Sequence, residues 1–256
     1  FIRFGSPTIN CKPRNDWLGR PPELKRFNRH SIMGFIIVPT QPFGFNYLGG
    51  KLLALLCCSH EARTQINDKY GSEICLFETT SLYGTTKSSS QYDGLKPYMR
   101  YKGLTMSDFT PLLHDDVFKG LNKWFIERNN NKLLVKEDAS SRKLKTQQKM
   151  ISIIKKSSSS QKAAEFQTAI VNAKNLTEKK RVYFSDYGFA NSREVIRGDT
   201  DKLEKNPINF DKFYQENLIK WWKNKASKRY ESLKSSGSLR TELEVWTKDM
   251  HIDIIR

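Results

Sequence analysis

One turn in the first quarter of the chain has a residue spacing that favours ligand binding. Gln41, Gly44 and Asn46 form a Q-x-x-G-x-N pattern, and Gly49 and Gly50 follow it. A helix that begins after such a turn presents free backbone N–H groups and a positive dipole end, which suit a phosphate or pyrophosphate. These five residues are therefore candidate ligand-binding residues. The alternative is an ordinary strand-to-helix connection in which the glycines allow close packing.

A carboxylate follows the second apolar run of the chain. The run Ile74–Phe77 predicts a buried strand, and Glu78 lies at its carboxyl end. Functional groups of α/β folds lie at this end of the strands. Apolar neighbours raise the pKa of a carboxyl group, which suits a general base. Glu78 is a candidate catalytic residue; the alternative is a helix-cap or salt-bridge partner.

Strands and a helix must position these residues. Residues 35–38 predict a strand that Pro39 stops, and apolar residues at helical spacing follow from Asn46, a plausible N-cap. Gly71 ends the helical stretch, and strands at residues 74–77 and 98–101 come next. This alternation predicts an α/β fold, because parallel strands need a crossover helix between them.

The charge of the chain is large and uneven. The 256 residues carry 44 Lys and Arg against 27 Asp and Glu, a formal net charge of +17. Residues 1–128 contribute 17 − 11 = +6, and residues 129–256 contribute 27 − 16 = +11. We expect three parts: a domain over 1–128 that is incomplete at its N-terminus, a polar linker over 129–160 that ends in a serine tract, and a basic, mainly helical extension over 161–256. An anionic partner is implied, with DNA favoured.

The extension contains the candidate nucleic-acid contacts. A basic amphipathic helix is predicted from residue 218 to residue 230, and a basic pair precedes a strand-like run at 182–184. Basic side chains pair with phosphates and aromatic rings stack on exposed bases. The alternative is a packed helix with a solvated lysine face. The candidate residues are Lys180, Arg181, Lys220, Trp221, Lys223, Lys225, Lys228 and Arg229.

Several function classes lack their signals. No apolar stretch approaches the length of a membrane span, and the four cysteines have no C-x-x-C spacing. We expect no metal site. The P-loop and the G-x-S-x-G elbow are absent from the sequence. A reduced, cytoplasmic protein of a bacterial or phage-infected cell fits best.

Short motifs along the first 105 residues carry a family resemblance; they are Trp17–Gly19, Arg26–Asn28, Ile36–Pro39, Leu76–Thr79 and Gly103–Thr105. They resemble the conserved domain of DruA-type proteins of the Druantia anti-phage system and the Mom-type DNA-modification enzymes of phages. The segment from residue 35 to residue 105 is similar to the core of the GNAT acyltransferase fold.

The GNAT resemblance implies a cofactor and an acid. Acetyl-CoA or another acyl-CoA would bind at the turn of residues 41–50, and a tyrosine would protonate the departing thiolate. Tyr92 occupies the best-matching position, and Tyr83 and Tyr98 are alternatives. Asn46 stands where the loop motif has Gly or Ala.

The expected fold is thus a GNAT-like mixed sheet with flanking helices and a basic helical C-terminal region. The expected function is acyl-CoA-dependent transfer to DNA or another nucleic acid, in phage or anti-phage DNA modification. The alternative, favoured by the departure at Asn46, is a non-catalytic nucleic-acid-binding protein. A third alternative is an intracellular scaffold whose lysines only confer solubility.

Overall fold

The computed structural model describes residues 1–20, 22–41, 43–81, 90, 92–105, 112–139, 141–175 and 179–243. The chain forms two compact units, one from Phe1–Met106 together with Lys180–Arg256 and one from Ser107–Lys179. The first unit therefore contains segments from both parts of the chain, which differs from the boundaries expected at residues 128 and 160.

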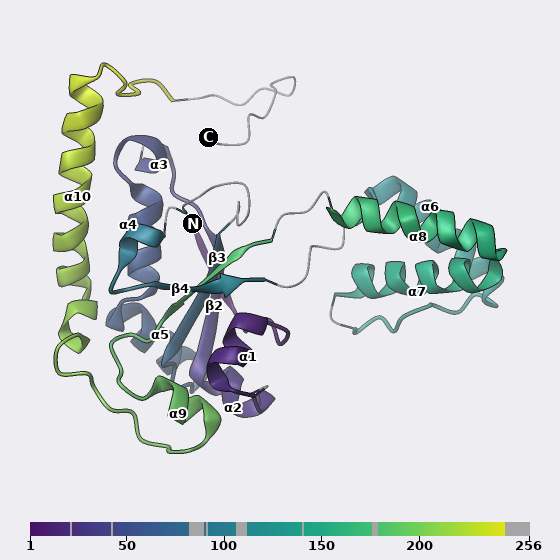
Figure 1. The fold of residues 1–256 in the computed structure, drawn as a ribbon, viewed down its shortest axis with the longest axis horizontal. Coiled ribbons are helices and arrows are strands. Elements are labelled where there is room, and N and C mark those ends of the chain that lie inside the picture. Colours follow the sequence, from purple (N-terminus) through teal and green to yellow (C-terminus); the bar gives the residue numbers. More distant parts are fainter. Residues whose placement is uncertain are drawn as a thin grey trace. The chain divides into compact units, whose positions relative to one another are not determined.

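A five-stranded sheet with the order β1-β2-β3-β5-β4 is the centre of the first unit (Figure 1). β2 and β3 are parallel, with Ser31 opposite Leu76, and the other neighbouring pairs are antiparallel. This mixed sheet confirms the α/β class. The strand-like run at 182–184 is a strand, but it lies between β3 and β4. The strands are β1 Ile2–Gly5, β2 Ser31–Ile37, β3 Leu76–Ser81, β4 Arg100–Leu104 and β5 Arg181–Ser185.

Helices α3 (Phe43–Asn46), α4 (Gly49–Cys57) and α5 (His60–Tyr70) connect the parallel strands β2 and β3. Gly71 ends α5 with φ 59°, as its position in the sequence predicts. The expectation that Asn46 caps a helix is wrong, because Asn46 ends α3 and Leu48 precedes α4.

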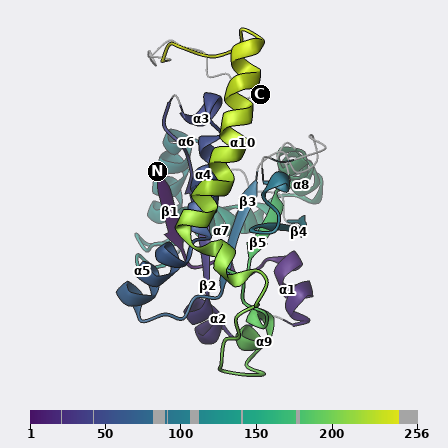
Figure 2. The same ribbon diagram turned by 90° about the vertical axis from the view of Figure 1, so that its left-hand side faces the viewer.

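Helix α10 (Gln215–Ser235) lies beside α3 and α4 in both views (Figures 1 and 2). The Trp222 indole Nε1–H donates to the Leu48 carbonyl at 3.2 Å, and the Tyr230 ring stacks on Tyr47 with centroids 5.7 Å apart. The aromatic side of α10 therefore faces the protein. None of the described helices, α10 included, is long and apolar enough to cross a membrane.

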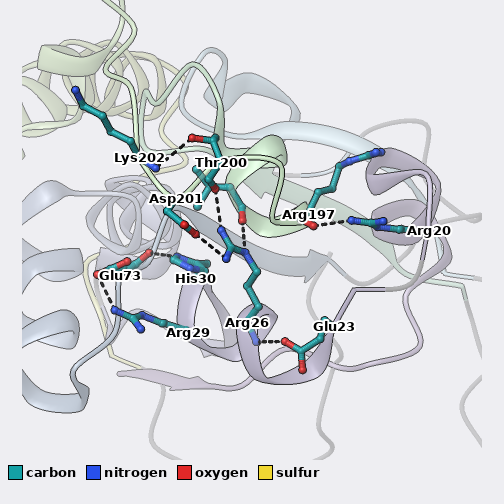
Figure 3. Close-up of polar contacts among 11 residues, drawn as sticks. Arg20, Glu23, Arg26, Arg29, His30, Glu73, Arg197, Thr200, Asp201 and Lys202 are labelled. Atoms are coloured by element: carbon teal, nitrogen blue, oxygen red, sulfur yellow. Dashed lines mark hydrogen bonds and ion pairs between the residues drawn. The ribbon is translucent and has the colours of Figure 1, made fainter.

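Arginine side chains join the segment after α1 (Lys12–Leu18) to α9 (Ser192–Arg197), and α2 (Leu24–His30) to α9 and the loop that follows it (Figure 3). The Arg26 guanidinium donates to the Val195 carbonyl at 2.6 Å, to the Thr200 carbonyl at 2.8 Å and to Asp201 at 2.8 Å. Because these bonds connect residues about 170 positions apart in the sequence, the N-terminal segment and the segment after residue 180 fold as one body.

The second unit consists of α6 (Asp115–Arg128), α7 (Arg142–Ser157) and α8 (Ser160–Asn175). The polar linker expected over 129–160 instead contains α7, which buries Thr146, Gln147 and Met150. The serine tract ends α7 at Ser157 and begins α8 at Ser160, and its two middle serines connect the helices. The sequence did not predict α7, because six of its residues are basic and only a narrow stripe of the helix is buried.

Candidate nucleic-acid interface

Glu78 lies within β3 and forms a buried ion pair. Its carboxylate is 3.0 Å from Nη1 of Arg14, and the two side chains are 2% and 0% exposed. Arg14 also donates to the backbone carbonyls of Thr8 and Ile9, at 2.7 and 2.6 Å. Burial raises the pKa of Glu78 to about 7, and Arg14 opposes this rise. The structure thus gives Glu78 a salt-bridge partner, the alternative kept open for it, and a carboxylate this enclosed has no surface to offer a substrate.

Tyr92 precedes the short 3-10 helix η1 (Asp93–Leu95) and is 3% exposed. Its ring meets the edge of Tyr183, with centroids 5.5 Å apart. The Tyr183 phenol donates to Asp93 at 2.6 Å, and burial together with this bond raises the pKa of Tyr183 to about 12. The role of Tyr92 as an acid stays a prediction. Tyr98 packs in the core, and Tyr83 lies outside the described residues.

The predicted cofactor turn is tightly packed. A Cβ added to Gly49 would lie 2.7 Å from the carbonyl oxygen of Phe43, and one added to Gly44 would lie 3.3 Å from Cγ of Pro39. Gly50 is also buried. The absence of a side chain at Gly49 therefore lets α3 approach the start of α4, as in the alternative of close packing.

Asn46 fastens the same turn to the segment after α10. Its Nδ2 donates to the Arg240 carbonyl at 2.6 Å, and the Arg240 N–H donates to its Oδ1 at 3.1 Å. The Asn46 side-chain amide is therefore paired with the chain itself. Gln41, the first residue of the predicted pattern, is half-buried. A side chain at Gly49 would meet Phe43, and the Asn46 amide is paired with Arg240. Acyl-CoA binding at this turn stays a prediction.

Three cations converge beside this turn instead. Lys51 is half-buried in the first turn of α4, and Lys225 and Arg229 lie one turn apart on α10. Burial lowers the pKa of Lys51, and the charges of Lys225 and Arg229 lower it further. Among the described residues, no carboxylate forms an ion pair with any of the three. We call Lys51, Lys225 and Arg229 the cation cluster.

The cation cluster lies next to the short helix η1. The Nζ atom of Lys51 is 3.8 Å from the position that a Cβ on Gly94 would take. The preceding residue, Asp93, already accepts from Tyr183 and from the Ser90 N–H. Three positive charges without an ion-pair partner among the described residues produce a local positive potential that attracts anions. The sequence alone did not identify Lys51 as a candidate residue. The only indication in the sequence was its position directly after Gly49 and Gly50.

The remaining basic residues of α10 face solvent. Lys220, Lys223 and Lys228 are exposed, as expected for phosphate contacts. Trp221 differs from the prediction, because its ring packs edge-on against Tyr98 with centroids 5.5 Å apart. Base stacking on Trp221 would therefore require this core contact to open.

Lys180 and Arg181 lie at the start of β5. The Lys180 N–H donates to the Thr105 hydroxyl at 2.9 Å, and burial lowers the pKa of its side chain. The Arg181 guanidinium lies 4.8 Å from the centre of the Tyr101 ring. The fold thus uses both residues at the β4–β5 edge, whereas the other candidates belong to α10.

The described residues offer neither an exposed thiol nor a cluster of metal ligands. Cys11, Cys57, Cys58 and Cys75 are free and buried. Within the described ranges, no group of three or more His, Cys, Asp and Glu side chains could hold a metal ion.

Comparisons with known proteins support one similarity. No curated protein matches the chain, and no solved structure matches it. The GNAT-like and Mom-type resemblance therefore stays a prediction. The family model of the Druantia protein DruA matches residues 1–91, the segment that contains β1, α1, α2, β2, the α3–α5 crossover and β3.

Proposed function

We propose that this protein binds nucleic acid through α10, with a backbone phosphate held by the cation cluster. The observation that carries the proposal is the convergence of Lys51, Lys225 and Arg229 without an acidic partner among the described residues. Keeping three like charges together costs free energy, which an anion between them offsets. Phosphates are the anions that nucleic acids present in regular series.

The exposed side of α10 extends this site. The helix carries six basic residues and two acidic ones, a net charge of +4 over 21 residues. All six basic side chains are exposed, and the aromatic rings face the protein. The helix therefore offers contacts to the phosphate backbone rather than to bases. Such contacts position a duplex without reading its sequence.

The DruA match supports a biological setting for this binding. Residues 1–91 supply α4, and with it Lys51, whereas α10 lies outside the matched segment. We propose a role in anti-phage defence, with DNA as the bound polyanion. Acyl transfer is not part of the proposal, because packing closes the turn and Glu78 is buried against Arg14. The non-catalytic alternative is the one that the geometry favours.

The test is DNA binding by a variant that removes two charges from the cation cluster. Fluorescence anisotropy with a short labelled duplex measures the affinity of the full chain and of the Lys225→Gln/Arg229→Gln variant. We expect a loss of about tenfold or more, since each charged contact to a phosphate contributes on the order of 1 kcal/mol.

A matched control distinguishes the loss of a specific phosphate site from the general effect of removing two positive charges. Lys25→Gln/Lys69→Gln removes the same charge from exposed positions on α2 and α5. We expect this control to change affinity less than about threefold at moderate salt. Equal losses in the two variants would contradict a site at the cation cluster.

A further inference from the structure

A cleft lies at the opposite end of β5 from the cation cluster, where β5 ends and β4 begins. Its volume is about 250 Å³, and Trp17, Arg100, Lys102, Phe184, Asp186 and Arg193 contribute to its lining. A second hollow of about 230 Å³ shares Arg100 and Asp186 with it. Small-ligand sites span roughly 300–1,000 Å³, so the two adjoining hollows provide the space of one small ligand.

One wall of the cleft is cationic. Lys102 and Arg193 are half-buried and Arg100 is exposed. The Arg193 Nε atom is buried and has no hydrogen-bond partner. No carboxylate among the described residues forms an ion pair with any of the three. A buried donor without a partner is costly, and an anion in the cleft would satisfy it.

The other wall is aromatic. The Trp17 and Phe184 rings meet edge-on, with centroids 5.6 Å apart. The Lys102 ammonium lies 5.5 Å from the Trp17 centroid and 5.8 Å from that of Phe184. Positive charge and ring surface are therefore adjacent, so an anion at Lys102 would bring the remainder of its ligand against Trp17. Burial and the Arg100 charge lower the pKa of Lys102, and Asp186 opposes them.

The turn after β5 fixes Asp186 at the cleft, because the Gly188 N–H donates to Asp186 Oδ1 at 2.9 Å. Tyr187 has φ 53° and Gly188 has φ 77°, two successive residues in the left-handed region. The Tyr187 phenol is anchored in the core by donation to the Cys57 carbonyl at 3.2 Å. A Cβ on Gly188 would lie 2.7 Å from Cα of Phe210. Such over-determined strain is concentrated at ligand sites.

We propose that this cleft binds a nucleotide, either free or as the end of a nucleic-acid strand. The phosphate accepts from Arg100, Lys102 and Arg193, and the base packs on Trp17. The Asp186 carboxylate accepts from a sugar hydroxyl. The cations, the ring surface and the Asp186 carboxylate of the cleft correspond to the three parts of a nucleotide, and a second carboxylate, Glu194, also lines it.

Calorimetric titration of the full chain with AMP tests the proposal. We expect saturable binding that is weaker by about tenfold or more in Lys102→Gln and in Arg193→Gln. The exposed Lys69→Gln variant on α5 should bind AMP as the wild type does. Inorganic phosphate and adenosine should each bind more weakly than AMP, since each lacks one half of the contacts. Thermal unfolding of each variant shows that it is folded.

A second arm distinguishes the two sources of the nucleotide. A short single strand with a 5′-phosphate is compared with the same strand without it, in a Lys220→Gln/Lys223→Gln/Lys228→Gln background that weakens α10. Preference for the phosphorylated strand, lost in Lys102→Gln, assigns the cleft to a strand end. Binding of AMP alone assigns it to a free nucleotide.

Two results would overturn the proposal. One is the absence of saturable binding of both AMP and the phosphorylated strand at millimolar concentration. The other is binding that Lys102→Gln and Arg193→Gln leave unchanged. Neither result bears on duplex binding at the cation cluster, which the Lys225→Gln/Arg229→Gln variant tests separately.

Discussion

Replacing Glu78 by glutamine tests whether this carboxylate is a structural group. Burial raises the pKa of Glu78 from 4.5 to about 7 in the folded protein. Between pH 4.5 and 7 the folded state therefore binds more protons than the unfolded state, so the free energy of unfolding falls as the pH rises. A shift of about 2.5 pH units corresponds to a loss of about 3 kcal/mol, complete above pH 7.

Glu78→Gln removes this titration and keeps the shape of the side chain. We expect the difference in unfolding free energy between Glu78→Gln and the wild type to move by about 3 kcal/mol in favour of the variant between pH 4.5 and 8. Chemical denaturation at a series of pH values measures it. Taking this difference cancels the contribution of His30 and His60, whose pKa values burial lowers.

Arg14→Met provides the second arm of the same experiment. Removing the guanidinium leaves the carboxylate buried without its partner, which costs roughly 3–5 kcal/mol when it is ionised. We expect this cost to be largest above neutral pH and to shrink in acid, where Glu78 binds a proton. A difference between wild type and Glu78→Gln that does not change with pH would refute the reasoning, and so would an Arg14→Met cost that is the same at pH 5 and pH 8.

Three further predictions concern packing and reactivity. Gly49→Ala should destabilise the protein by roughly 1–3 kcal/mol in urea denaturation, because its Cβ would lie 2.7 Å from the Phe43 carbonyl oxygen; a neutral result would mean that α3 can move aside. Asn46→Ala should increase proteolysis near Arg240, since it removes both bonds that fasten this segment; unchanged cleavage would show that other contacts hold it. The four buried cysteines should react with a thiol reagent only on unfolding, because burial raises the pKa of each thiol; rapid labelling of the native protein would contradict the burial.

Local signals in the sequence predicted much of the sheet. The apolar run before Pro39 and the run before Glu78 gave adjacent parallel strands, because a helical pattern ending at Gly71 separates them. The same reasoning could not place β5. Its partners β3 and β4 precede it by about 75 to 105 residues, with the second unit between, and pairing at this separation leaves no local pattern.

The candidate site was also predictable only where local patterns determine it. Helical spacing identified most of α10 as a basic amphipathic helix, and the side of it that carries Trp222 and Tyr230 faces the protein. It could not show that Glu78 meets Arg14, 64 residues earlier, or that Asn46 meets Arg240, 194 residues later. The role proposed for Lys51 depends on α10, whose residues Lys225 and Arg229 lie close enough to lower its pKa.

The salt dependence of DNA binding tests the central proposal most directly. The DNA affinity of the wild type and of Lys51→Gln/Lys225→Gln/Arg229→Gln is measured from about 50 to about 200 mM salt. For each protein the logarithm of the binding constant is plotted against the logarithm of the salt concentration. Each lost phosphate contact lowers the slope by about 0.9, and the cation cluster holds one phosphate, so the triple variant should have a slope smaller by about 1 and a weaker affinity at every salt concentration. A variant with the slope and affinity of the wild type would contradict a phosphate site at the cation cluster.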